Sequence, residues 1–268
     1  MSDDSRFTGS IPATYDELLV PVLFRPFAAD LVARVRDLAP ATILELAAGT
    51  GVVSHMLAAS LPQARIVATD LNPAMLEIAS SHGTSANLSF EPADAQHLPF
   101  ADDSFDLVVA QFGAMFFPDR IGAFQEALRV LGDNGTLLFN VWDRLEANTG
   151  SAAIHDAVRS VLPDPKPDFI ARTPFGYNDR SVIKRELQAA GFTMVDIAEV
   201  VRTGPPGSAP LLARGICQGT PLANELALHS PSDQDNALKA ATSAAEALEA
   251  DGPLLMTALV VTASPAIA

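Results

Sequence analysis

The chain has 268 residues, which is long enough for one large α/β domain with or without a smaller lid. Of these residues 49% are hydrophobic and only 6% are aromatic. Its 32 acidic and 17 basic residues give a formal charge of −15, so we expect no nucleic-acid partner. The single Cys217 excludes an internal disulfide, Met1–Phe7 does not resemble a signal peptide, and the apolar runs fall short of the ~20 residues of a membrane span, so we expect a cytoplasmic protein.

The first predicted element is a helix over Tyr15–Leu38. Its apolar residues recur at helical spacing, and Pro21 and Pro26 interrupt it. We expect this segment to cover one end of a sheet.

From residue 42 onward, short β-rich runs alternate with helical patterns, which is typical of right-handed βαβ units and a mostly parallel sheet. The predicted strands are Thr42–Leu46, Arg65–Asp70, Leu88–Glu91, Phe105–Gln111 and Thr136–Val141. The predicted helices are Val52–Ser60, Pro73–Ser80 and Arg120–Leu131. Leu107–Ala110 is apolar at consecutive positions, which indicates a strand covered on both faces.

After Trp142 the pattern becomes mainly helical. The predicted helices are Ser151–Val161, Asp179–Ala190, Ala209–Cys217, Leu222–His229 and Gln234–Ala250, and the β-rich runs are Phe192–Val201 and Leu254–Thr262. We expect the helices between these two runs to form a substrate lid.

The segment Ile43–Gly51 joins a strand to a helix through small residues, so a ligand can approach its backbone closely. In an open α/β sheet, the carboxyl ends of the strands are the usual position of a ligand. A tight turn without a ligand is the alternative interpretation.

Asp70 ends the next predicted strand, nineteen residues after Gly51, and its carboxylate can accept both hydroxyls of an adenosine ribose. On its own it could be a solvated residue or a helix cap, although Asn72 can supply the cap. A dinucleotide site is the competing interpretation, but Ser54 stands where its fingerprint requires Gly or Ala. The pair of Asp70 and the glycine loop therefore favours a nucleoside ligand.

Taken in order, the segments Ile43–Gly51, Asp70–Leu76, Ala93–Phe100 and Phe105–Phe117 resemble the motif set of class I S-adenosylmethionine-dependent methyltransferases. The resemblance covers roughly residues 40–145 and is greatest to the small-molecule branch with type 11 and ubiquinone/menaquinone-biosynthesis-like members. It implies an α/β fold with a doubly wound, seven-stranded, mostly parallel sheet, whose last strand lies antiparallel between strands five and six, and helices on both faces. It also implies a helical segment at 1–39 over the cofactor and a Rossmann-like domain at 40–268, with lid helices at about 145–180 and 205–250.

The resemblance further implies S-adenosyl-L-methionine as cofactor. The implied cofactor-binding residues are Ala47, Gly49 and Gly51 along the methionine part, Asp70 on the ribose, Leu71 and Met75 around the adenine, Asp94 and Ala95 at the adenine edge, and Gln111 at the end of the fourth strand. By itself, Asp94 could equally be an acid in a surface loop.

The implied reaction is in-line methyl transfer to a small-molecule acceptor, for which no metal is needed. Phe112, Met115, Tyr15 and Arg25 are candidates for the acceptor pocket, and His155 and His229 are candidates for a general base. Packing explains the apolar candidates equally well, and a surface or core-capping role is the simpler interpretation of each histidine. A nicotinamide-dependent oxidoreductase and a non-catalytic nucleoside-binding protein are the alternative functions, and we expect a monomer or homodimer.

Overall fold

The computed structural model describes Asp4 and residues 7–265, and these fall into two compact units. The sheet unit comprises Phe27–Val141, Tyr177–Glu199 and Leu259–Ala268, and the helical unit comprises Met1–Pro26, Trp142–Gly176 and Val200–Ala258. The unit boundaries at Trp142, Val200 and Ala258 fall inside strands.

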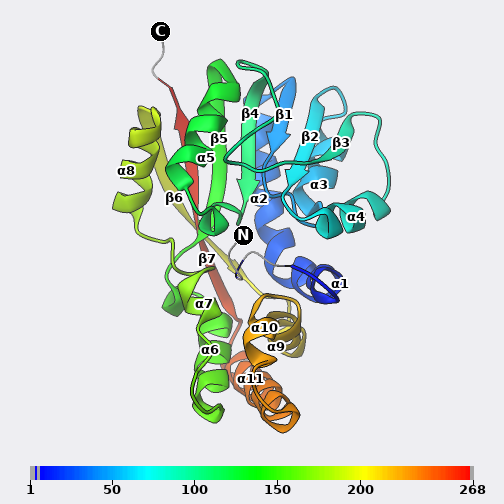
Figure 1. Ribbon diagram of the computed structural model, residues 1–268, viewed down its shortest axis with the longest axis vertical. Helices are drawn as coiled ribbons and strands as arrows, with labels where there is room; N and C mark the ends of the chain where they lie inside the picture. Colours follow the sequence, from blue (N-terminus) through cyan, green and yellow to red (C-terminus); the bar gives the residue numbers. More distant parts are fainter. Residues whose placement is uncertain (1–3, 5–6, 266–268) are drawn as a thin grey trace. The chain divides into compact units, whose positions relative to one another are not determined.

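The sheet has seven strands in the order β3-β2-β1-β4-β5-β7-β6 (Figure 1). The strands are β1 (Thr42–Glu45), β2 (Arg65–Asp70), β3 (Leu88–Pro92), β4 (Phe105–Gln111), β5 (Leu131–Trp142), β6 (Met194–Thr203) and β7 (Leu255–Ser264). Pairs β1–β2, β1–β4, β2–β3 and β4–β5 are parallel. Strand β7 is antiparallel to β6, because Thr193 N donates to Ser264 O while Gly204 N donates to Leu254 O at the other end. The predicted insertion of the last strand between the fifth and sixth is confirmed.

Helices surround the sheet unit. They are α2 (Arg25–Leu38), α3 (Val52–Ser60), α4 (Pro73–Ser81), α5 (Arg120–Val130), α8 (Arg180–Ala190) and the short η3 (Ala114–Phe116). Helices α5 and α8 lie side by side in Figure 1, and Arg120 Nε donates to Glu186 Oε2 between them at 2.9 Å. All four residues of Leu107–Ala110 in β4 are buried, as the consecutive apolar residues predict.

The helical unit contains α1 (Ile11–Thr14), η2 (Tyr15–Phe24), η4 (Leu145–Ala147), α6 (Thr149–Val161), α7 (Phe169–Arg172), α9 (Ala209–Gln218), α10 (Leu222–Leu226) and α11 (Pro231–Asp251). Helices α6, α9 and α11 pack against one another (Figure 1). Helix α11 buries Ala237, Ala241 and Ala245, whose spacing puts small side chains on one face and allows close approach. Over the described part of the chain, no helix combines the length and the apolar character needed to cross a membrane.

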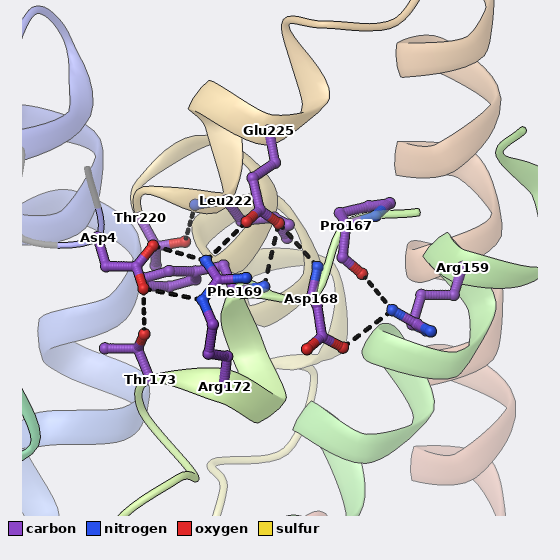
Figure 2. A network of polar contacts seen from close by, with 10 residues as sticks. All are labelled: Asp4, Arg159, Pro167, Asp168, Phe169, Arg172, Thr173, Thr220, Leu222 and Glu225. Carbon is purple, nitrogen blue, oxygen red and sulfur yellow. Dashed lines mark hydrogen bonds and ion pairs between the residues drawn. The ribbon is translucent and has the colours of Figure 1, made fainter. Parts of the chain in front are cut away.

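A polar cluster in the helical unit holds the short helix α7 (Figure 2). Glu225 Oε2 on α10 accepts from Asp168 N at 2.8 Å and from Phe169 N at 3.0 Å, which caps the start of α7. Arg172 at its end donates to Glu225 Oε1 at 2.8 Å and to Asp4 Oδ1 at 2.6 Å. The cluster therefore joins α7, α10 and Asp4 through charge-assisted hydrogen bonds.

Several predicted boundaries differ from the structure by a few residues, and two of the differences reflect unusual backbone geometry. The predicted helix Tyr15–Leu38 starts as the π-helix η2, in which Arg25 N donates to Val20 O, and becomes α-helical only at Arg25. Pro21 lies inside η2 and has no N–H, so a wider turn there accommodates a residue that an α-helix excludes. Strand β5 begins at Leu131 rather than Thr136, and its register with β4 shifts between Phe105 and Leu107.

Candidate functional site

The glycine loop lies where β1 ends, between β2 and β4. Ala48 N donates to Thr69 O at 2.9 Å and Leu46 N donates to Val109 O at 2.8 Å, which ties the loop to both neighbouring strands. Ala47, Gly49 and Gly51 all have left-handed backbones, with φ of 51°, 57° and 82°. A Cβ on Gly51 would lie only 2.9 Å from Ala79 Cβ, so both backbone and packing require glycine there.

Asp70 and the glycine loop meet, as the spacing predicts. Asp70 Oδ2 accepts from Gly49 N at 2.8 Å, and Oδ1 accepts from Asn72 N at 2.8 Å. Burial raises the pKa of Asp70, while the N–H groups of Asn72 and Gly49 oppose that rise. Asn72 Nδ2 also donates to Oδ1, at 3.5 Å, so Oδ2 is the oxygen with more capacity to accept a ligand hydroxyl.

Glu45 is a second buried carboxyl group, at the end of β1. Ser54 Oγ donates to Glu45 Oε2 at 2.5 Å. Burial raises the pKa of Glu45 to about 8, and the charge of Asp70 adds to the rise while the Ser54 hydrogen bond opposes it. Glu45 is therefore mostly neutral at pH 7, and its donor Ser54 is the residue at which this loop departs from the dinucleotide pattern.

Of the two residues predicted to bind the adenine, Met75 is buried and Leu71 is exposed. Met75 is 4% exposed, and its Cε lies 3.6 Å from where a Gly49 Cβ would stand, so its side chain packs against the glycine loop. Leu71, next to Asp70, is 41% exposed. The structure thus gathers both residues near the loop, and their sandwich around an adenine stays a prediction.

The segment that contains Asp94 and Ala95 lies beside the end of β2. Ala93 N donates to Asp70 O at 3.2 Å, and Asp94 Oδ1 accepts from Gln96 N at 2.9 Å. Asp94 and Ala95 are both half-buried. The structure places this segment next to Asp70, whereas hydrogen bonding of Asp94 and Ala95 to the edge of an adenine stays a prediction.

The turn after β4 touches the glycine loop. Half-buried Gln111 ends β4, and the next residue, Phe112, has a left-handed backbone with φ of 51°. A Cβ on Gly113 would lie 2.6 Å from Ala47 Cβ, so only glycine allows this close approach. Phe112 and Met115 are buried side chains, so packing accounts for them and their role in an acceptor pocket stays a prediction.

Two buried polar atoms at this edge of the sheet have no hydrogen-bond partner among the described residues, Thr50 Oγ1 and Asn140 Nδ2. Thr50 belongs to the glycine loop and is 3% exposed, and Asn140 on β5 pairs in register with Gln111. Buried polar groups without partners are rare and call for a ligand, a water or an ion. Because Thr50 belongs to the glycine loop, its hydroxyl fits a polar ligand at this edge.

Sequence reasoning assigned no role to Thr50, Asn140 or the Glu45–Ser54 pair. For Asn140 a signal exists, since it is the one polar residue in the apolar run Leu137–Trp142. A polar residue inside a buried strand indicates a specific hydrogen bond or a ligand.

The remaining acceptor-pocket candidates, Tyr15 and Arg25, belong to the helical unit. The ring of Tyr15 stacks on Phe24, with centroids 4.8 Å apart, and meets the edge of Phe7 at 5.9 Å. Arg25 is exposed. Roles for Tyr15 and Arg25 at cofactor or substrate stay predictions.

The two candidate bases also lie in the helical unit. His155 is buried on α6, where burial lowers its pKa and the charge of Arg159 lowers it further. His229 is half-buried after α10, and its N–H donates to Leu226 O at 3.0 Å. Neither histidine is assigned a catalytic role by these contacts.

A family model described as "Methyltransferase domain" matches residues 44–139, the part of the chain with the glycine loop, Asp70 and the turn after β4. The malonyl-[acyl-carrier protein] O-methyltransferase of Hahella chejuensis is 36% identical over 126 residues, which cover 47% of this chain and 44% of that protein. The chain thus spans about half the length of this relative.

A longer match is to the malonyl-[acyl-carrier protein] O-methyltransferase of Methylococcus capsulatus, which is 32% identical over 208 residues, 76% of this chain and 71% of that protein. Among solved structures, phosphoethanolamine N-methyltransferase 2 of Haemonchus contortus in complex with S-adenosyl-L-methionine has a TM-score of 0.63 and 16% identity. This match covers 99% of this chain and 60% of the Haemonchus chain, and it supports the predicted fold.

Proposed function

This chain belongs to the family of S-adenosylmethionine-dependent methyltransferases, and we propose that it transfers a methyl group from S-adenosyl-L-methionine to a small-molecule acceptor. The observation that carries the proposal is the hydrogen bond from Gly49 N to Asp70 Oδ2, which joins the glycine loop to the ribose-binding acid. The unpartnered hydroxyl of Thr50 supports it, because a ligand in the loop would provide the missing partner.

The cofactor, when bound, supplies an electrophilic methyl group on a sulfonium, so the protein needs mainly to bind and orient the reactants. In our proposal the carboxylate of Asp70 holds the ribose hydroxyls, while the small residues of the glycine loop let the backbone come close to the methionine part. Burial raises the pKa of both carboxyl groups, Glu45 and Asp70, and the backbone N–H groups of Asn72 and Gly49 oppose that rise at Asp70. The side chain of Met75 packs against the glycine loop at Gly49.

The acceptor is the least defined part of the proposal. We assign acceptor recognition to helices of the helical unit, which includes most of the predicted lid at about 145–180 and 205–250. Malonyl-acyl carrier protein joins the acceptors to be tested because two relatives carry that substrate in their names. Quinone, phenol, amine and fatty-acid-like small molecules complete the set.

The test is a screen with S-adenosylmethionine labelled in its methyl group, together with calorimetric binding of the cofactor. Label should enter at least one acceptor, and Asp70→Ala should weaken cofactor binding about 10- to 100-fold because it removes charge-assisted hydrogen bonds to the ribose. Asp106→Ala is the matched control, since Asp106 also accepts two backbone N–H groups, from Ala41 and Thr42, but before β1 rather than after it.

Asp106→Ala should bind the cofactor as the wild type does. A wild-type protein that binds no S-adenosylmethionine would refute the proposed function. Equal affinity of Asp70→Ala and wild type would refute the ribose assignment alone.

A further inference from the structure

Asn140 lies inside β5 and has a fully buried side chain, with 0% exposure. The N–H of Phe112, in the turn after β4, donates to Asn140 twice: to the backbone oxygen at 3.1 Å and to the side-chain Oδ1 at 2.9 Å. One residue of β5 thus accepts from the same N–H with its main chain and its side chain.

The other half of the Asn140 amide has no such contact. Its Nδ2 finds no hydrogen-bond partner within the described chain. Turning the amide over would not help, because the N–H of Phe112 would then face a donor instead of an acceptor. An unpaired buried donor costs stability, and the buried Leu138, two residues before Asn140 on the same face of β5, shows that apolar side chains suit this face. The acceptor half must therefore contribute something that offsets the cost of the donor half.

The N–H group that donates to Oδ1 belongs to Phe112, whose backbone has an unfavourable conformation. Phe112 has φ of 51°, in the left-handed region that a bulky residue rarely adopts. Such conformations persist only where their surroundings hold them, and they gather at ligand sites. The two hydrogen bonds from Phe112 N to Asn140 of β5 stabilise this conformation.

The turn at Phe112 bears directly on the glycine loop. The next residue, Gly113, approaches Ala47 so closely that a Cβ would come within 2.6 Å of Ala47 Cβ, and Ala47 is itself left-handed. Two left-handed turns, after β1 and after β4, thus lie in contact. A shift of Phe112 would displace the turn against which the glycine loop packs.

We propose that Asn140 is a positioning residue of the cofactor site, which acts through the N–H of Phe112 to hold the turn after β4 against Ala47 in the glycine loop. The proposal rests on the proposed function, because it takes the glycine loop as the place where S-adenosylmethionine binds. Asn140 touches neither reactant in this role.

The test compares Asn140→Leu, which removes both halves of the amide, with Asn140→Asp, which keeps an acceptor oxygen for Phe112 and removes the donor. Binding of S-adenosylhomocysteine is measured by calorimetry, and exchange of the Phe112 amide hydrogen is measured without ligand. Asn140→Leu should weaken binding about tenfold or more and accelerate exchange at Phe112. Asn140→Asp should restore both to within about threefold of the wild type.

Asn87→Leu is the matched control for lost stability. Asn87 Nδ2 donates to Leu61 O and Ala64 O, both at 3.1 Å, at the start of β3 rather than at the carboxyl ends of the strands. This variant should lower the melting temperature and leave both the affinity for S-adenosylhomocysteine and the exchange at Phe112 unchanged. The same loss of affinity in Asn87→Leu would overturn the proposal, because the effect would then be general destabilisation.

Unchanged binding and exchange in Asn140→Leu would also overturn it, and so would an equal loss in Asn140→Asp and Asn140→Leu. If Asn140→Leu does not fold, Gly113→Ala disturbs the same turn from its other side and should likewise weaken binding about tenfold. Failure of the wild type to bind S-adenosylhomocysteine would refute the proposed function, whereas exchange at Phe112 still tests the action of Asn140.

Discussion

Glu45 and Asp70 are buried carboxyl groups at the ends of adjacent strands, and their hydrogen bonds distinguish them. Asp70 accepts from two backbone N–H groups, which favour its ionised form. Glu45 accepts from the hydroxyl of Ser54 alone among its side-chain contacts, and burial raises its pKa to about 8. At residue scale, the two acids thus differ in their donors: backbone N–H groups oppose the rise in the pKa of Asp70, and a hydroxyl opposes it at Glu45.

The raised pKa of Glu45 predicts a pH dependence of stability. Neutral Glu45 suits its buried position, so its contribution is complete below pH ~4.5, the ordinary pKa, and is lost as the pH rises toward 8. Glu45→Gln stays neutral and can still accept from Ser54, so it should escape this loss. In thermal melts, the variant should gain stability over the wild type steadily between pH 5 and pH 8.

Glu77→Gln, at an exposed position of α4, is the control and should follow the wild type at every pH. Wild-type and Glu45→Gln melting curves that stay parallel from pH 5 to pH 8 would contradict the raised pKa.

At the scale of elements, α7 shows how a helix of four residues is kept in place. So short a helix is not stable by itself, because its few internal hydrogen bonds do not offset the cost of ordering it. Glu225 on α10 caps its start and binds Arg172 at its end (Figure 2). Helices α7 and α10 therefore stabilise one another.

Glu225→Ala should release α7, since it removes the cap and leaves one partner fewer for Arg172. We expect a loss of about 1–3 kcal/mol, which lowers the melting temperature by roughly 2–10 °C, and faster hydrogen exchange over Phe169–Arg172. Glu225→Gln keeps an acceptor, so its melting temperature and its exchange over α7 should lie between those of Glu225→Ala and the wild type. The control Glu246→Ala changes an exposed acid on α11 and should alter neither the melting temperature nor the exchange over α7. Unaltered exchange over α7 in Glu225→Ala would argue against the cap.

Elements with a clear period were predictable from the sequence, and those with special geometry were not. Strands Arg65–Asp70 and Phe105–Gln111 match their predicted bounds, because consecutive apolar residues between turn signals define them. The start of β5 was missed because Gly132 and Gly135 look like a turn. The π-helical form of η2 was missed because its many apolar residues fit an α-helical pattern equally well. In the site, chain spacing sufficed for Asp70, whereas the role of Asn140 depends on the register of β4 with β5, which one sequence does not reveal.

At the scale of the whole molecule, the family and the cofactor predict that ligand binding stabilises the fold. A ligand that binds only the native state adds about 2.7 kcal/mol at one hundred times its Kd. We therefore expect S-adenosylhomocysteine at that excess to raise the melting temperature by about 5–10 °C. NAD at the same concentration should cause no shift, and a shift with NAD alone would favour the oxidoreductase alternative.

The helical unit consists of three separate stretches of chain, and three of its boundaries fall inside β5, β6 and β7. For protein engineering this interleaved order has a practical effect. A chimera that borrows acceptor recognition from another member of the family needs three coordinated exchanges, and at the joins within β5, β6 and β7 the new residues must keep the alternation and register of the sheet. Because joins at these places would interrupt paired strands, substitution of individual side chains on the helices is the simpler way to test the proposed role of the helical unit in acceptor recognition.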